Sequence, residues 1–184
     1  MIKRIVGVGS GFSSAVMLDT FDALGSEDYK ITFIEPYPER LQSLVKIGAD
    51  SRLVLHQEFL QKVNVDLFNS LEPGDLLFID SSHVLKYRSD LHFILFNILP
   101  LLKPGVIVHF HDIFHQFEYP SDWLKEGRYW NECYFLRAFL SGNKEWKILL
   151  FNDYANRIFS EKIQDRMPLC QKNFGGSLYI EKTG

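Results

Sequence analysis

Histidine and aspartate residues gather at the ends of two apolar runs in this sequence. Asp80 closes the run at residues 75–80 and His83 follows it, while His111 and Asp112 follow the run at residues 106–110. If the runs are neighbouring parallel strands, about 4.8 Å apart, these side chains face one pocket at the carboxyl edge of a sheet. A neutral imidazole accepts a proton from a hydroxyl near pH 7, and a divalent metal that lowers the hydroxyl's pKa is the alternative. The pattern predicts acid–base chemistry, with Asp80, His83 and His111 as catalytic candidates.

Several of these residues also have purely structural interpretations. Asp80 can cap the helix that follows its strand, and Asp112 can cap a loop turn. His109 lies deeper in its strand, so we expect it in the core. Cys133 lies inside an apolar helical segment and is expected to pack there rather than react.

A glycine-rich turn and an acid mark a second candidate site. The segment Gly7-Val8-Gly9-Ser10-Gly11 lies where a first strand turns into a helix, and Glu35 ends the second strand. Glycines let the backbone approach a ligand, and an acid at this place accepts hydrogen bonds from both hydroxyls of a ribose. A dinucleotide site wants a third glycine, but Phe12 or Ser14 stands there, and no lysine or arginine is close in the sequence. The spacing favours a nucleoside without phosphates.

The first two thirds of the chain alternate short apolar runs with amphipathic segments. Apolar runs without polar alternation are typical of parallel strands that are buried on both faces between helices. We predict strands at residues 5–8, 31–34, 52–55, 75–80 and 106–110, and helices at 13–24, 38–47, 58–70 and 87–99.

The last third has a different pattern. Residues 111–129 are long, aromatic and aperiodic, which is typical of a functional loop or lid. A helix is expected at 130–140, and strands at 146–151 and 177–181 that no clear helix separates are expected to form an antiparallel pair. Aromatic side chains beside histidines and acids suit a planar or sugar-like ligand, and the alternative is a small satellite core. They also suit a homodimer that covers the site.

Length and composition narrow the class of protein. The 184 residues suit one domain, 1–184, and the net charge of −3 leaves no basic footprint for nucleic acid or an anionic membrane. Two cysteines make no disulfide framework, and neither a long apolar span nor a signal peptide is recognised. We expect a cytoplasmic protein.

The sequence resembles the class I S-adenosylmethionine-dependent methyltransferases. The likeness rests on Val8-Gly9-Ser10-Gly11, on Ile34-Glu35-Pro36, on residues 78–83, and on the Leu-Lys-Pro-Gly turn that enters the strand at 106–110. It implies an α/β fold: a Rossmann-like, doubly wound, mostly parallel seven-stranded sheet with an antiparallel C-terminal strand.

The resemblance also assigns binding roles. Gly9, Ser10 and Gly11 would line the methionine portion of S-adenosylmethionine, and Glu35 would hold the ribose. Gln57 and Glu58 would lie near the adenine, and Asp80 would lie between the cofactor and the methyl acceptor.

Two positions bear on how far the likeness extends. In catechol- and caffeoyl-type relatives, a divalent ion is held by an acid after strand four and by an Asp-Asn pair after strand five. By this likeness Asp80 and Asp112 would be ligands of an ion such as Mg²⁺. His111 replaces an acid of that pair, which suits a softer ion or a catalytic base. Gly7 stands where the family usually has an acid that helps hold the cofactor.

The expected function is transfer of a methyl group from S-adenosylmethionine to a small-molecule or glycan-type acceptor, at oxygen, with His111 or His83 as proton acceptor. One alternative is a non-catalytic binding module that keeps the fold, which Gly7 favours. Another is a nicotinamide-dependent oxidoreductase, against which the missing third glycine and the terminal strand pair argue.

Overall fold

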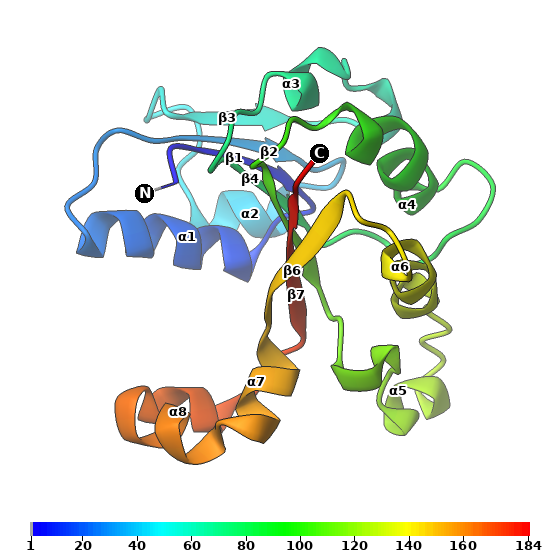
Figure 1. Ribbon diagram of the computed structural model, residues 1–184. Coiled ribbons are helices and arrows are strands. Elements are labelled where there is room, and N and C mark those ends of the chain that lie inside the picture. Colours follow the sequence, from blue (N-terminus) through cyan, green and yellow to red (C-terminus); the bar gives the residue numbers. More distant parts are fainter. Residues whose placement is uncertain (1) are drawn as a thin grey trace.

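The computed structural model describes residues 2–184 and contains a seven-stranded sheet in the order β3-β2-β1-β4-β5-β7-β6 (Figure 1). Strands β1 to β5 are parallel, and β7 pairs antiparallel with both β5 and β6. The predicted mostly parallel sheet with an antiparallel C-terminal strand is therefore confirmed. The strands are β1 Arg4–Val8, β2 Lys30–Ile34, β3 Leu53–His56, β4 Leu76–Ile79, β5 Ile107–His111, β6 Trp146–Phe151 and β7 Ser177–Lys182.

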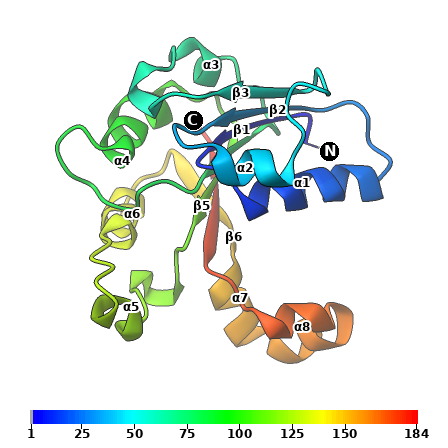
Figure 2. The same ribbon diagram turned by 180° about the vertical axis from the view of Figure 1, so that it is seen from behind.

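Helices cover both faces of the sheet. In Figures 1 and 2, α1 and α2 lie on one face, and α3 and α4 lie on the other. The α-helices are α1 Phe12–Ala23, α2 Glu39–Leu44, α3 Asp66–Asn69, α4 Asp90–Phe93, α5 Ser121–Lys125, α6 Glu132–Leu140, α7 Asn152–Ile158 and α8 Ser160–Arg166. Within residues 2–184, every helix is too short or too polar to cross a lipid bilayer.

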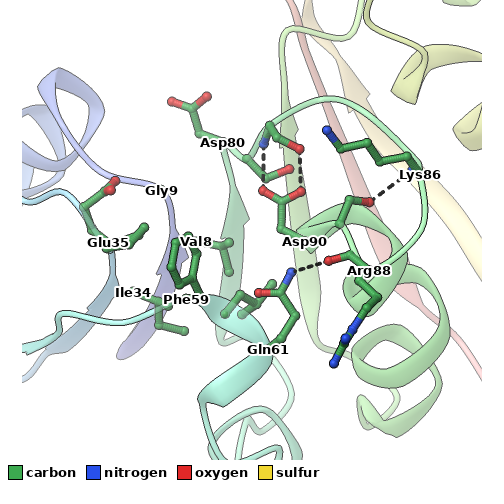
Figure 3. Close-up of a pocket in the computed structure, with 15 residues that line it drawn as sticks. Val8, Gly9, Ile34, Glu35, Phe59, Gln61, Asp80, Lys86, Arg88 and Asp90 are labelled. Atoms are coloured by element: carbon green, nitrogen blue, oxygen red, sulfur yellow. Dashed lines mark hydrogen bonds between the residues drawn. The ribbon is translucent and has the colours of Figure 1, made fainter.

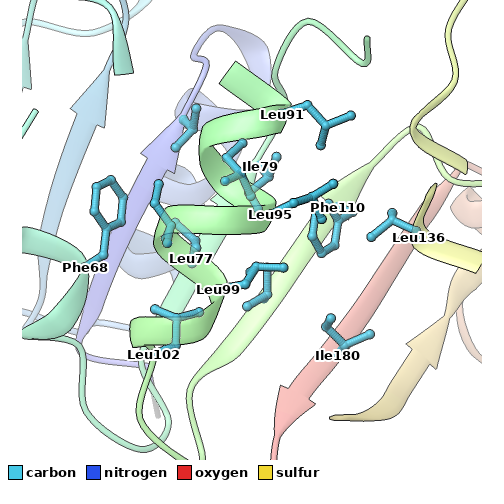
Figure 4. Close-up of a cluster of buried hydrophobic side chains, with 14 of the residues drawn as sticks. Phe68, Leu77, Ile79, Leu91, Leu95, Leu99, Leu102, Phe110, Leu136 and Ile180 are labelled. Carbon is cyan, nitrogen blue, oxygen red and sulfur yellow. The ribbon is translucent and has the colours of Figure 1, made fainter. Parts of the chain in front are cut away.

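Two hydrophobic clusters explain why the strands are apolar on both faces. Leu77, Ile79 and Phe110 point toward α4 and α6, where they join one cluster (Figure 4). Phe33 and Phe78 point to the opposite face, where α1 and α2 supply the second cluster. Because successive side chains alternate between the faces and both faces are covered, most positions of these strands are apolar, with Thr32 and His109 as buried exceptions.

Several helices are shorter than predicted. Residues 58–70 form only a 3₁₀ turn at Leu60–Lys62 and the one-turn helix α3, whose first N–H, that of Asp66, donates to the Asn64 side chain. The helix at 38–47 ends at Leu44 because Val45 is buried in an extended conformation. The helix predicted from residue 87 starts at Asp90, and Ser89 caps it by accepting the His92 N–H.

The segment between β6 and β7 was predicted wrongly. Instead of a plain return it contains α7, α8 and a 3₁₀ turn at Pro168–Lys172. These helices lie beyond the far end of β6 and β7, away from the other helices (Figure 2). Because they are mostly exposed, they lack the apolar face that makes a helix visible in a sequence.

Candidate functional site

The turn after β1 brings the backbone of Gly9 against the end of β4. Gly9 has a φ of +84°, and a Cβ built on it would lie 1.9 Å from the carbonyl oxygen of Asp80. The Gly9 N–H donates to the Ile34 carbonyl at 3.1 Å, and the Asp80 N–H donates to the Val8 carbonyl at 2.9 Å. Only glycine fits this position, because both its conformation and the space exclude a side chain.

Glu35, at the end of β2, contacts the glycine-rich turn. The Ser10 N–H donates to Oε2 of Glu35 at 3.1 Å, and the Tyr37 N–H donates to Oε1 at 3.0 Å. Figure 3 shows the side chains of Glu35 and Asp80 at the ends of two strands on either side of Gly9. The turn and the acid are therefore neighbours, as the sequence predicted.

A pocket of about 460 Å³ opens at this edge of the sheet (Figure 3). Its walls come from the ends of β1, β2 and β4, from the segment after β3, and from the loop before α4. Glu35 and Asp80 supply negative charge, and Lys86 and Arg88 supply positive charge. Lys86 and Arg88 come from the loop before α4, so basic side chains reach the pocket although none is close to the glycine-rich turn in the sequence.

The third strand was misjudged by one residue, and this changes the pocket wall. β3 ends at His56, and Glu58 turns back to lie 3.5 Å from the His56 ring. Neither Gln57 nor Glu58 lines the pocket; Phe59 and the next two residues do. Gln57 and Glu58, which were expected on the adenine side, therefore lie outside this wall, and Phe59 and its neighbours form it. Ser10 and Gly11 form the turn beside the pocket rather than its wall.

His83 is a buried cation among carboxylates. Its Nδ1 lies 2.7 Å from Oε2 of Glu132, and its Nε2 lies 3.4 Å from Asp80 Oδ1 and 3.9 Å from Asp112 Oδ2. Burial favours loss of the proton, but the contacts with Asp80 and Glu132 outweigh it and raise the pKa of His83 to about 10. With this pKa His83 holds its proton at neutral pH, which disfavours it as the proton acceptor.

The two aspartates respond differently to burial. For Asp80 the effect of burial is outweighed by the His83 and His111 side chains, and its pKa is lowered. For Asp112 burial dominates, and its pKa is raised. Asp80 is therefore the firmly ionised carboxylate of the site.

His111 remains accessible at the end of β5. Its side chain is 37% exposed, its Nε2 lies 3.8 Å from Asp112 Oδ1, and its Nδ1 lies 3.4 Å from His109 Nε2. His109 is buried and stacks on Phe78 with ring centroids 4.2 Å apart. Burial, reinforced by His111, lowers the pKa of His109 to about 3, so it is neutral, as expected of a core histidine.

The metal site expected at Asp80 and Asp112 is not formed. The His83 ring contacts both carboxylates, and a protonated imidazole beside them disfavours a second cation there. Throughout residues 2–184 no group of three or more His, Cys, Asp or Glu side chains is arranged to hold a metal ion.

The aromatic segment packs mainly on itself. Trp123 packs edge-on against Phe114 and Trp130, with ring centroids 5.2 and 5.1 Å apart, and Arg128 covers its face. No aromatic residue of this segment lines the pocket described above. Cys133 is buried beneath it, and burial raises the pKa of its thiol to about 11. The structure thus contains the satellite core, while Tyr129 and Tyr134 of the same segment stay exposed.

Sequence reasoning missed Glu132, Phe59 and Lys86. Glu132 is 1% exposed, on the same face of α6 as the buried Cys133 and Leu136. An acid on the apolar face of a helix is the signal that could have found it, since such a group needs a partner.

Comparison with known proteins places this geometry in context. A family model described as a methyltransferase domain matches residues 5–113. No curated protein matches the sequence. Among solved structures, a candidate methyltransferase from Thermobifida fusca YX matches with a TM-score of 0.60 and 12% identity, over 100% of this chain and 74% of that one.

Two further structures carry ligands. The plantazolicin methyltransferase BpumL, in complex with SAH (S-adenosylhomocysteine), matches with a TM-score of 0.54 and 12% identity, over 99% of this chain and 76% of that one. CmcI with Mg and SAM (S-adenosylmethionine) matches with a TM-score of 0.52 and 14% identity, over 99% of this chain. The chain spans 65% of the length of CmcI. At these identities the likeness establishes a shared fold.

Proposed function

Because this chain belongs to the methyltransferase-domain family and has the class I fold, we propose that it is an S-adenosylmethionine-dependent methyltransferase acting on a hydroxyl group of a small molecule. The observation that carries the proposal is the contact between Glu35 and the glycine-rich turn. This contact places the Glu35 carboxylate and the backbone of the glycine-rich turn, which a ligand can approach closely, at the same side of the pocket. The ligands named for BpumL and CmcI favour the same cofactor.

The pocket fits that cofactor in size and chemistry. Its 460 Å³ lies within the range of small-molecule sites, about 300–1,000 Å³. Glu35 has lone pairs left to accept the two ribose hydroxyls, and Phe59 offers an apolar face to a base. Asp80 and Lys86 carry charges opposite to the amino and carboxylate groups of a methionine portion.

When bound, S-adenosylmethionine supplies an electrophilic methyl group on its sulfonium sulfur. The chain's own residues then have two tasks. Asp80, kept ionised by His83, stabilises positive charge beside the pocket. His111 accepts the proton of the acceptor hydroxyl, and Asp112 stabilises the imidazolium that forms.

The second candidate function is ligand binding without catalysis. It is favoured by Gly7, which leaves no acid at the position that usually helps to hold the cofactor. Turnover separates the two: release of S-adenosylhomocysteine with a panel of hydroxylated compounds indicates an enzyme, and binding without release indicates a module.

Calorimetric titration with S-adenosylhomocysteine tests the proposal directly. We expect Glu35→Ala to weaken binding about tenfold or more, since it removes a charged hydrogen-bond acceptor. Glu39→Ala, at an exposed position on α2, is the matched control and should bind like the wild type. Absence of binding to the wild-type chain would refute the proposed function.

A further inference from the structure

A second cavity lies on the face of the sheet that α1 covers. A groove of about 590 Å³ runs along α1, between that helix and the strands β4, β5 and β7. Figure 1 shows α1 lying under β1, while β6 and β7 extend beyond it. The groove is thus bounded by the helix on one side and by the open face of the sheet on the other.

The floor of the groove is aromatic. The Phe78 and His109 rings stack on each other, parallel within 7° and with centroids 4.2 Å apart, and Tyr179 meets His109 edge-on at 4.5 Å. Because the two stacked rings cover each other and are only 7% and 4% exposed, a ligand in the groove meets ring edges. Ring edges carry partial positive charge and suit the face of a planar ring in an edge-to-face contact.

The side wall of the groove is apolar and exposed. Phe12 is 68% exposed and Val16, one helical turn later, is 62% exposed. Among the described residues that line the groove there is no Asp, Glu, Lys or Arg. A charged ligand would lose its hydration here without gaining a partner, so the groove favours a neutral one.

Ser13 and His111 line one end of the groove, where α1 begins and β5 ends. The Thr20 hydroxyl, further along α1, already donates to the Val16 carbonyl. A ligand that carries a hydroxyl group would therefore direct it to this end.

A series of side chains links this end to the pocket beside Glu35. Asp80 lines that pocket and lies 3.4 Å from His83 Nε2, which lies 3.9 Å from Asp112. Asp112 in turn lies 3.8 Å from His111, which lines the groove. An unbroken series of polar contacts thus connects the pocket and the groove.

We propose that this groove binds the methyl acceptor, and that the acceptor is a neutral, flat, mostly apolar molecule with a hydroxyl group directed at His111. Its role as acceptor rests on the proposed function, whereas the class of ligand rests on the groove itself. The aromatic segment after β5 then has no part in holding the acceptor.

The probe 2-naphthol has these properties, and two relatives lack one each: 2-naphthoate is charged, and glucose is not apolar. We expect 2-naphthol to bind the wild-type chain in a calorimetric titration, and the other two to bind at least about tenfold more weakly. Val16→Trp fills the groove and Val16→Arg places a charge in it, and both should weaken 2-naphthol binding. Leu124→Trp, at an exposed position on α5 outside the groove, is the control.

Each contrary result has a distinct meaning. Equal binding of the three probes, or 2-naphthol binding that both Val16 variants leave unchanged, would overturn the proposal. If light scattering shows a dimer and the dimer does not bind 2-naphthol, a second copy of the chain covers the groove. This result would also overturn the proposal. A separate titration with S-adenosylhomocysteine reports on the proposed function, so failure of that function is recognised independently.

Discussion

Nδ1 of His83 lies 2.7 Å from Oε2 of Glu132, and both side chains are buried. The backbone makes the same connection, since the N–H groups of Asn131 and Glu132 donate to the His83 carbonyl. The loop after β4 is thereby fixed to the beginning of α6. Because His83 also contacts Asp80 and Asp112, this pair supports both carboxylates at the edge of the sheet.

Glu132→Ala should lower the free energy of unfolding by about 3 kcal/mol, because it removes one member of a buried ion pair. Urea denaturation measures the change. Glu126→Ala is the control: Glu126 forms an ion pair with Arg128 on the surface, and its removal should cost less than about 1 kcal/mol. Equal effects of the two substitutions would contradict the buried-pair interpretation.

Stability should depend on pH through His83. Its pKa is about 10 in the folded protein, against 6.5 for the free side chain, so folding strengthens proton binding. The stabilisation is complete below about pH 6.5 and is lost as the pH rises toward 10, with a slope of at most about 1.4 kcal/mol per pH unit. Urea unfolding at pH 7 to 9 measures the slope, and it should be smaller in His83→Gln. An identical slope in both proteins would assign it to other groups.

Gly9→Ala should be far more damaging than Gly7→Ala. At Gly9 a methyl group meets the Asp80 carbonyl and the positive φ adds strain, so we expect a loss of about 2 kcal/mol or more and weaker S-adenosylhomocysteine binding. At Gly7 the nearest atoms to a Cβ are 3.7 Å away, an ordinary contact. Thermal denaturation and calorimetry check both variants, and similar losses would show that space at Gly9 is not limiting.

The sheet and its edge were predictable because local patterns determine them. Buried parallel strands must be apolar throughout, and the acid at Glu35 directly follows such a run. The ends of the short helices were not predictable, because they depend on tertiary contacts. The helices between β6 and β7 were not predictable, because they are mostly exposed and have no apolar face.

The partners of individual side chains were also beyond the sequence. No local sequence pattern indicates that His83 contacts Glu132, which is 49 positions away. That contact helps to raise the pKa of His83, so the ring is protonated at neutral pH. The residues after β3 that line the pocket depend on where that strand ends. The apolar pattern of β3 is weak, so the sequence predicts its last residue only to within a residue or two.

His111 is the preferred candidate for the proton acceptor, because His83 already carries a proton and the low pKa of the buried His109 makes it a weak base. With any acceptor that a methylation assay identifies, His111→Ala should reduce kcat by about 10²–10⁴, the usual contribution of a general base. Affinity for S-adenosylhomocysteine should stay within about twofold of the wild type, because His111 does not line the pocket beside Glu35. Turnover measured by mass spectrometry and binding measured by calorimetry are the two readouts.

His115→Ala is the control, because His115 also follows β5 but lines neither the pocket nor the groove, and this variant should retain turnover. Normal turnover in His111→Ala would remove the base from the mechanism and leave positioning alone to account for catalysis.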